Sequence, residues 1–383
     1  MRNQLLLGVA LALLPLACAG AETLDDALSQ AYLSNPTLQA ERAQLRATDE
    51  DLPQARAQRR PTITGQGQVG YTGESTNRLG HQTLYPRGAT INLNQPLWTG
   101  GRAGAAISQA DFLIKAERAN LLNVEETVLL QAATSYLDVV RDQIVLDLAD
   151  SNVKVLKATL DQTRAQLDAG VATRTDLAQS EARLAQGIAD RRQAQANLNN
   201  SRAAYQQAVG EMPGTLKPPP EVRDLPPNLD SATQQAQTDN PQVLFAQANH
   251  EAALAGVDLA ESQLMPSLAL SGLLGHLNDQ QIEEDRTDTA ALLLTLTVPF
   301  YQAGAEYSRI RQAKESSGQA RNQIEAAVRL ATQNVTDSWE NLQAARAKVR
   351  SFQSQVEANQ IAYNGTVEEQ RVGTRTVLDV LNA

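Results

Sequence analysis

The sequence is poor in the residues that build enzyme sites and large globular cores. It contains one cysteine, Cys18, three histidines and only 4% aromatic residues in 383 positions. Cys18 falls within a predicted signal peptide, so we expect neither disulfides nor thiol chemistry in the mature chain. The histidines stand apart without the spacing of paired metal ligands, which favours surface positions over a metal site. No metal, cofactor or catalytic residue is therefore predicted.

Positive charge and long apolar runs are also scarce. The chain has 33 Lys and Arg against 43 Asp and Glu, a formal net charge of −10. This acidic balance argues against nucleic acid as a partner. Beyond the amino-terminal leader no apolar run approaches the roughly 18 residues of a membrane-spanning helix, so a membrane role would have to come from strands. Carboxylates are abundant, but no pattern confines a pair of them to an apolar cleft, and we do not expect an enzyme.

The amino terminus has the pattern of an export signal. Arg2 precedes the apolar run 5–17, and the small residues Ala19 to Ala21 follow before Glu22. These features predict a signal peptide over residues 1–21. A lipoprotein anchored at Cys18 is an alternative, but Pro15 stands where a lipobox carries an aliphatic residue. We therefore expect an exported chain.

Two different periods follow one another from Gly88 onward. Polar and apolar residues alternate over residues 89–94, the pattern of a strand with two unlike faces. After Thr99-Gly-Gly101, apolar residues recur at intervals of seven with one four-residue stutter, which is typical of a coiled-coil seam. The seam residues are Ile107, Ile114, Leu121, Val128, Val139, Leu146, Val153, Leu160 and Leu167. No proline interrupts residues 102–169, which predicts a rod of roughly 100 Å at 1.5 Å per residue.

The same layout occurs twice along the chain. Asn35-Pro36 recurs as Asn240-Pro241, and the seam of the first rod recurs 203 positions later at Leu342, Val349, Val356 and Tyr363. We predict a first repeat over 22–210, with strands at about 61–71 and 88–97 joined by a long polar loop. A proline-rich linker over 211–228 and a second repeat over 229–383 follow. The first repeat continues for about thirty residues beyond the point equivalent to Ala383, so the final helix of the second repeat is predicted to be truncated.

The predicted strands suit a membrane barrel. In residues 289–298 one face is apolar, with Ala290, Leu292, Leu294, Leu296 and Val298. Four strands of about ten residues in an exported chain are typical of outer-membrane barrels. Four strands cannot close such a barrel, because no backbone group can stay unpaired in lipid. Two chains would give eight strands and three would give twelve, and twelve leave a lumen. Trp98, Phe300 and Tyr301, which end the two hairpins, are predicted at the membrane interface.

Similar turns follow the two rods. Gly170 is predicted to end the first rod in the left-handed conformation, and Thr175 to cap the helix that follows. Asp176 and Arg375 lie in equivalent turns of the two repeats, so helix hairpins that meet at a tip could pair them. The alternative is that Thr175 and Asp176 only cap a helix and that Arg375 is solvated.

The chain resembles the outer membrane factor family, the TolC-type channel-tunnels of Gram-negative bacteria. The resemblance covers the whole mature chain. It is carried by Asn35-Pro36, Pro61, Pro266, Gln95-Pro-Leu-Trp98, Val298-Pro-Phe-Tyr301 and Val372-Gly-Thr-Arg-Thr-Val-Leu-Asp-Val-Leu381. It implies an α+β membrane protein with two structural repeats. Its long α-helical coiled-coil barrel is continuous with a trimeric 12-stranded β-barrel, to which each chain contributes four strands.

The resemblance also implies a function. The expected role is a passive exit duct for efflux or type I secretion, set in the outer membrane lipid with its helical tunnel in the periplasm. A homotrimer would connect through a periplasmic adaptor (membrane fusion) protein to an inner-membrane transporter of the ABC or RND type. A periplasmic coiled-coil adaptor without a barrel, or a secreted helical adhesin, is the alternative. The duplicated strand hairpins favour the duct, and the sequence names no cargo.

Five residues acquire roles from the resemblance. Thr175, Asp176 and Arg375 are expected to form a closing gate at the tunnel tip, and Asp379 and Asn382 to line the pore aperture. A ring of Asp379 side chains would favour cations. Two positions depart from the family pattern, because Gln370 replaces the tyrosine of the closing network and Asn382 replaces a second ring aspartate. Closure is therefore expected to be looser, or made by other contacts, and cation attraction weaker.

Overall fold

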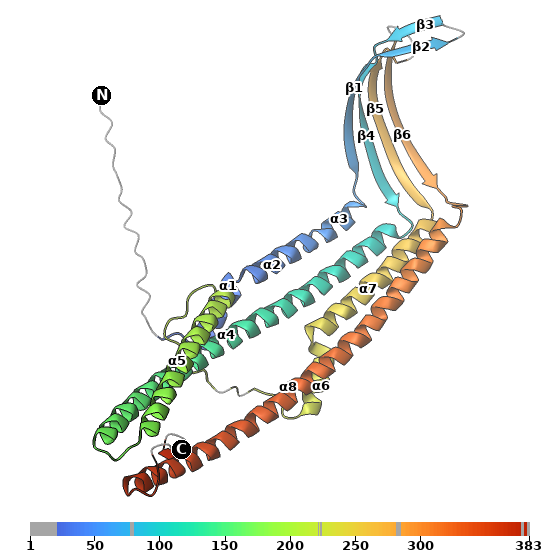
Figure 1. Ribbon diagram of the computed structural model, residues 1–383. Coiled ribbons are helices and arrows are strands. Elements are labelled where there is room, and N and C mark those ends of the chain that lie inside the picture. Colours follow the sequence, from blue (N-terminus) through green and yellow to red (C-terminus); the bar gives the residue numbers. More distant parts are fainter. Residues whose placement is uncertain are drawn as a thin grey trace, which may run out of the picture. The chain divides into compact units, whose positions relative to one another are not determined.

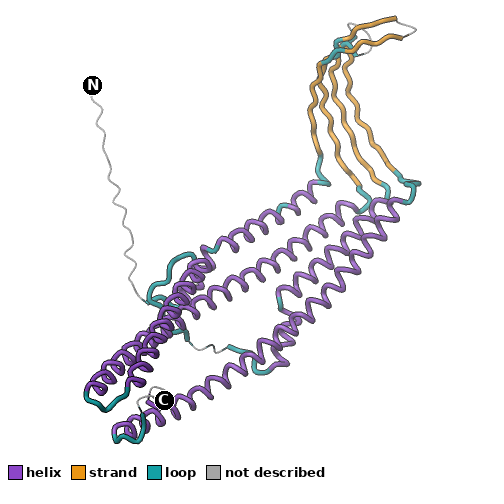
Figure 2. The backbone as a smooth tube through the Cα atoms, viewed as in Figure 1, coloured by secondary structure: helices purple, strands orange, loops and turns teal. Residues whose placement is uncertain are grey.

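The computed structural model of the protein describes residues 21–76, 80–220, 222, 224–280, 285–376, 379 and 380. Nearly all of the predicted signal peptide, with Cys18, lies outside the described residues, as does Asn382. Helices make up most of the described chain, as Figure 2 shows. The helices are α1 (Leu24–Ser34), α2 (Pro36–Asp49), α3 (Asp51–Ala57), α4 (Arg102–Asp168), α5 (Arg174–Val209), α6 (Leu229–Asp239), α7 (Pro241–Glu261) and α8 (Ala305–Arg371). The strands are β1 (Thr62–Val69), β2 (Thr72–Thr76), β3 (Gly80–Leu84), β4 (Arg87–Trp98), β5 (Ser267–Asn278) and β6 (Arg286–Thr297).

Both predicted rods are confirmed as single long helices. α4 and α8 each run for 67 residues without a break. In α4 the predicted seam is buried, with Leu146 at 7% and Leu160 at 8% exposure. The equivalent residues of α8, Val349 and Tyr363, are 56% and 41% exposed. The difference arises because α5 returns along the seam of α4, where Leu198 and Tyr205 join the same apolar cluster as Leu146. The apolar seam of α4 is therefore covered by a neighbouring helix of the same chain.

Small and polar residues let α5 pack closely on α4. A Cβ atom at Gly187 would lie 2.7 Å from Cδ1 of Leu156, a distance that no larger residue could adopt without displacing its neighbour. The buried Ser180 hydroxyl donates a hydrogen bond to Oγ1 of Thr163 at 3.3 Å. Since buried hydroxyls are costly without a partner, this pair keeps the hairpin in one register.

The four long strands form one antiparallel sheet in the order β1-β4-β5-β6. Figure 1 shows them side by side and curved. The predicted pairing of the first two strands is confirmed, since Thr62 pairs with Asn94 and Val69 with Arg87. The prediction of a plain polar loop between them is wrong, because β2 and β3 form a second, two-stranded sheet there. The small polar residues of this segment show no alternation of apolar and polar side chains, so the pairing left no periodic signal.

The register gives the four-stranded sheet one apolar and one polar face. Residues directly opposite each other across a strand pair share a face. One face carries Ile63, Ile91, Leu93, Leu268, Leu270, Leu274, Leu292, Leu294 and Leu296. The other face carries Thr62, Thr64, Gln66, Thr90, Asn92, Asn94, Ser271, Thr289, Thr295 and Thr297, together with Leu273 and Leu293. The apolar face predicted for residues 289–298 is thus confirmed and extends across all four strands.

The described chain divides into two compact units. One unit contains α1, α5, the residues of α4 from Thr127 onward and those of α8 from Gln355 onward, and its core is the cluster around Tyr136, Leu198 and Tyr205. The other contains the sheets, α2, α3, α6, α7 and most of α8. Each unit draws on both predicted repeats. In the described part of the chain, no helix combines the length and the apolar composition that crossing a lipid bilayer would need.

Candidate functional site

Two turns of matching geometry follow the two rods. Gly170 has a φ of 76° and Gly373 a φ of 82°, the left-handed region that favours glycine. The amide of Gly170 donates to the carbonyl of Leu167 at 2.9 Å, and the amide of Gly373 donates to the carbonyl of Gln370 at 3.0 Å. Such bonds satisfy the last carbonyls of a helix. The predicted left-handed end at Gly170 is confirmed, and α8 ends in the same way.

A threonine and an aspartate then start the next helical segment in both turns. The hydroxyl of Thr173 donates to the Asp176 carboxylate at 2.7 Å, and the Asp176 amide donates back to this hydroxyl at 3.2 Å. Thr376 and Asp379 make the same two bonds at 2.8 and 3.2 Å. The amides of Thr173 and Thr376 also donate to these carboxylates, at 2.9 and 2.8 Å, so both pairs are capping boxes in which two free amides of a helix start are satisfied reciprocally.

The expectation that Thr175 caps the helix is wrong, because Thr173 is the capping residue. Thr173 has extended backbone angles, φ −99° and ψ 163°, whereas Thr175 already lies inside α5. Val171 and Ala172 complete the turn that begins at Gly170. Thr173 follows in the extended conformation that a capping residue requires. The two turns are equivalent as predicted, and position by position Thr173 and Asp176 match Thr376 and Asp379.

Both aspartates carry a negative charge at neutral pH. Hydrogen bonds from the hydroxyl and the amide of Thr173 lower the pKa of the Asp176 carboxyl. Bonds from the amide and the hydroxyl of Thr376 lower the pKa of Asp379 in the same way. The start of a helix also favours a negative charge. The turns therefore present fixed carboxylates that can attract cations or accept a hydrogen bond from a cationic side chain.

The structure does not bring Arg375 to Thr175 or Asp176. The Nε atom of Arg375 lies 2.9 Å from a carboxylate oxygen of Glu369, and both side chains are about half exposed. Asn382 lies outside the described residues. The gate assigned to Thr175, Asp176 and Arg375 and the aperture assigned to Asp379 and Asn382 remain predictions.

The predicted interface aromatics lie where strands give way to helices. Trp98 ends β4, and Phe300 and Tyr301 follow β6. Their side chains are 52%, 94% and 88% exposed, respectively. Large aromatic residues with this exposure at the end of an apolar sheet face are available to a lipid interface or to another chain.

A cluster around Glu22 was not anticipated from the sequence. The amide of Glu22 donates to the carbonyl of Thr215 at 2.9 Å, and its carboxylate accepts a hydrogen bond from the hydroxyl of Tyr205. The hydroxyl of Tyr136 lies 3.0 Å from the Glu22 carbonyl oxygen and 2.6 Å from that of Lys217. Burial and the Glu22 carboxylate raise the pKa of Tyr205, so its phenol stays protonated. The residue that follows the predicted cleavage site is thus anchored to α4, α5 and the linker.

Long helical rods joined to a curved, two-faced sheet define a channel-forming protein of the outer membrane type. The chain belongs to the outer membrane efflux protein family, whose model matches residues 27–211 and 232–383. The predicted resemblance is confirmed. As in this family, the protein is an outer membrane channel for efflux or secretion, with its helical tunnel in the periplasm. This outcome favours the duct over the adaptor and the adhesin.

Individual relatives agree with the family match. The chain is 34% identical to outer membrane efflux protein BepC of Brucella suis, over 94% of this chain and 79% of that protein. It is 24% identical to outer membrane protein TolC of Escherichia coli, over 95% of this chain and 76% of that protein. Among solved structures, the CmeC outer membrane channel of Campylobacter jejuni aligns with a TM-score of 0.83 at 17% identity, over 94% and 79% of the two chains.

Proposed function

We propose that three copies of this chain form a passive exit duct, each adding four strands to a 12-stranded barrel. One observation carries the proposal: the sheet has an apolar and a polar face, and the outer edges of its first and last strands have no neighbouring strand. In the described part of the chain β1 and β6 each pair on one side only. A strand edge left unpaired in lipid is not tolerated, so β6 of one copy must pair with β1 of the next.

The faces of the sheet decide its orientation in the barrel. The leucine-rich face, with Leu292, Leu294 and Leu296 each more than 60% exposed, turns to lipid. The face with Thr90, Asn92 and their neighbours turns to a water-filled lumen. Eight strands from two copies would be filled by such side chains, whereas twelve leave a passage. Trp98, Phe300 and Tyr301 then lie at the periplasmic edge of the lipid, where aromatic residues are favoured.

The turns at the ends of the rods form the gate in this proposal. Arg375 exchanges Glu369 for the turn that holds Thr175 and Asp176 when the duct closes. Each exposed pair contributes only about 0.2–1 kcal/mol, so a ring of them can be opened by a partner. Asp379, held by Thr376, adds a ring of negative charge at the aperture, and this charge favours cations. Asn382 lines the same aperture without adding charge.

The partners follow from the passive character of the duct. Nothing in the described fold supplies energy for transport, so the driving force comes from an inner-membrane transporter of the ABC or RND type. A periplasmic adaptor (membrane fusion) protein joins the transporter to the gate. The rods are rich in Ala, Gln and Asn, which suit a wet lumen but bind no one cargo selectively, so the proposal places selectivity in the transporter and the adaptor.

Electrophoresis of detergent-extracted outer membranes tests the proposal. Samples kept cold should migrate as a trimer, and boiled samples as a single chain, because a closed barrel resists detergent until heated. Osmotic-shock fluid from the same cells is the control for periplasmic protein. Recovery of an unassembled monomer in that fluid would contradict the barrel and support a periplasmic adaptor.

A further inference from the structure

The leucine-rich face of the sheet changes character at the end away from the helices. The register aligns Ile91, Leu274 and Ala290 as the last apolar row of this face across β4, β5 and β6. Further rows on the same face lie two residues farther along each strand, because side chains alternate between faces. These rows consist of Ala89, His276 and Asp288, and then of Arg87, Asn278 and Arg286. The face that the proposed barrel turns to lipid therefore ends in polar and charged side chains.

Strand length places this end at the outer surface of the bilayer. β4 and β6 lead into helices, so their starts at Arg87 and Arg286 point away from the helical tunnel, as Figure 1 shows. Arg286 and Leu296 lie at or near the two ends of β6, about 33 Å apart at 3.3 Å per residue. A strand tilt of about 40° reduces this distance to roughly 25 Å of height, the thickness of the apolar band of outer-membrane barrels. Arg286 therefore reaches the headgroups of the outer leaflet.

Two exposed tyrosines mark the same level. Tyr71 follows β1 and Tyr85 precedes β4, and the centroids of their rings lie 5.8 Å apart in an edge-to-face contact. The two side chains are 67% and 59% exposed. Outer-membrane barrels carry aromatic residues at both interfaces. With Trp98 at the other end of β4, the apolar face is bounded by aromatic residues at both ends.

Two arginines expose positive charge at this end of the face. The Nε and one Nη atom of Arg286 lie 3.0 and 2.9 Å from one carboxylate oxygen of Asp288. One Nη atom of Arg87 lies 3.5 Å from the carboxylate of Asp279. Both arginine side chains are still 66% exposed. Because a guanidinium group has five N–H donors, the two acids hold the arginines in place and leave donors for another acceptor.

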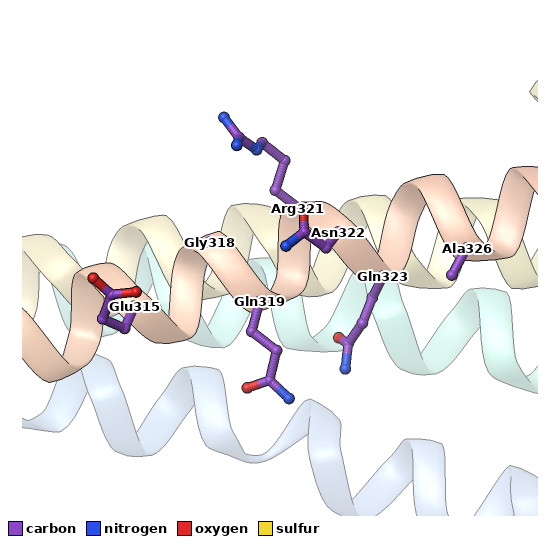
Figure 3. A pocket seen from close by; sticks show the side chains of 7 residues that line it. All are labelled: Glu315, Gly318, Gln319, Arg321, Asn322, Gln323 and Ala326. Carbon is purple, nitrogen blue, oxygen red and sulfur yellow. The ribbon is translucent and has the colours of Figure 1, made fainter.

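An apolar hollow lies beside these charges. It is lined mainly by Ala89, Ile91, Leu274, His276, Asp288 and Ala290. The small side chains of Ala89 and Ala290 leave room between larger apolar neighbours. A hollow on α8 has a different lining, because Figure 3 shows Glu315, Arg321 and several amide side chains around it. The hollow on the sheet thus suits an apolar chain, and its charged rim suits an anionic head on that chain.

We infer that Arg87 and Arg286 bind a phosphate group of the phosphorylated glycolipid in the outer leaflet, while one of its acyl chains fills the hollow. The inference rests on the proposed barrel, because it requires the leucine-rich face to meet lipid. Guanidinium groups donate paired hydrogen bonds to phosphate oxygens in a forked geometry. Asn278 lies between the two arginines in the same row and can donate its second amide hydrogen.

Titration of the purified full chain with lipid A tests this site. Wild-type trimers in detergent should bind lipid A with both phosphates about tenfold more tightly than lipid A without phosphate, since charged hydrogen bonds are lost. Arg87→Gln with Arg286→Gln should abolish this preference. Arg321→Gln with Arg329→Gln is the matched control, because it removes two exposed arginines from α8 and should keep the preference. Inorganic phosphate, which has no acyl chain, should not displace lipid A.

The outcomes separate the lipid site from the duct itself. Gels that show heat-sensitive trimers precede each titration. Equal affinity of wild-type trimers for the two forms of lipid A overturns the lipid site and leaves the duct standing, and so does an unchanged preference in trimers of the Arg87 and Arg286 variant. Displacement by inorganic phosphate overturns a lipid as the occupant. Absence of wild-type trimers before titration overturns both proposals.

Discussion

Asp176 and Asp379 perform the same task in two turns that lie 203 positions apart. Each carboxylate accepts a hydrogen bond from the hydroxyl of the threonine three residues before it, at 2.7 Å and 2.8 Å. The repeat is therefore preserved in side-chain bonding as well as in helix length. The hydrogen bonds that cap the helices also lower the pKa of both carboxyls, so both are charged at neutral pH.

The capping role of Thr173 predicts a local loss of stability. Thr173→Ala removes a hydrogen bond to the first turn of α5 and should destabilise that turn by about 0.5–2 kcal/mol. Hydrogen exchange measured by mass spectrometry should show faster exchange of the amides at 174–178. Thr175→Ala is the matched control and should leave these amides unchanged, since Thr175 lies inside the helix. A larger effect at Thr175 would restore the original assignment of the cap.

The same turn should weaken in acid. The pKa of Asp176 is lower in the folded state than in the unfolded chain, so its carboxylate stabilises the turn above the unfolded value of about 3.9. This contribution is lost as the pH falls through the lowered pKa. Exchange at 174–178, corrected for its intrinsic pH dependence, should therefore accelerate below about pH 4. Asp176→Asn should remove the pH dependence, and an unchanged profile in this variant would exclude Asp176 as its origin.

The strongest periodic signals in the sequence correspond to the parts of the fold that were predicted. The rods, the four long strands and the apolar face of β6 follow from repeats of seven and two. Thr173 and Thr175 both stand near the start of α5, and the error lay in choosing the second, because the three-residue spacing of a capping box to Asp176 selects Thr173. The offset of 203 that relates the rod seams also matches Gly170 with Gly373, and it identifies Thr173 as the cap.

Other features had no local signal. Glu22 and Tyr205 are 183 positions apart, so only the folded chain brings them together. The hint available in the sequence was that two of its few tyrosines, Tyr136 and Tyr205, fall on the inner faces of α4 and α5. The sheet of β2 and β3 is built largely from small polar residues, so no alternation of apolar and polar side chains marks its strands in the sequence. Arg375 pairs with Glu369, six residues before it, and its contacts in the proposed gate would depend on neighbouring copies that a single sequence does not specify.

Two neighbouring leucines of β6 test the assignment of the sheet faces. Leu294 and Leu293 are 63% and 61% exposed but point to opposite faces. Leu294→Arg should impair assembly in the outer membrane, because arginine on the lipid face of a barrel costs about 2–4 kcal/mol near the bilayer centre. Leu293→Arg should assemble normally and shift the ion selectivity toward anions. Trimer yield and reversal potential measure the two effects, and equal loss of trimer in both variants would contradict the assignment.

The gate assignment predicts a change in current. Arg375→Ala and Asp176→Ala should each raise the single-channel conductance, because each removes one member of the proposed closing link. Arg329→Ala is the control, since Arg329 pairs with Glu325 on the body of α8. Wild-type conductance in both turn variants would remove Arg375 and Asp176 from the gate and leave them as a solvated residue and a helix cap.

Single-channel recording of the purified wild-type protein in a planar lipid bilayer tests the account most directly. We expect stepwise ion currents that favour cations, carried by material that migrates as a heat-sensitive trimer. A protein that stays monomeric in water and adds no current to the bilayer would contradict the closure of the sheet by neighbouring copies.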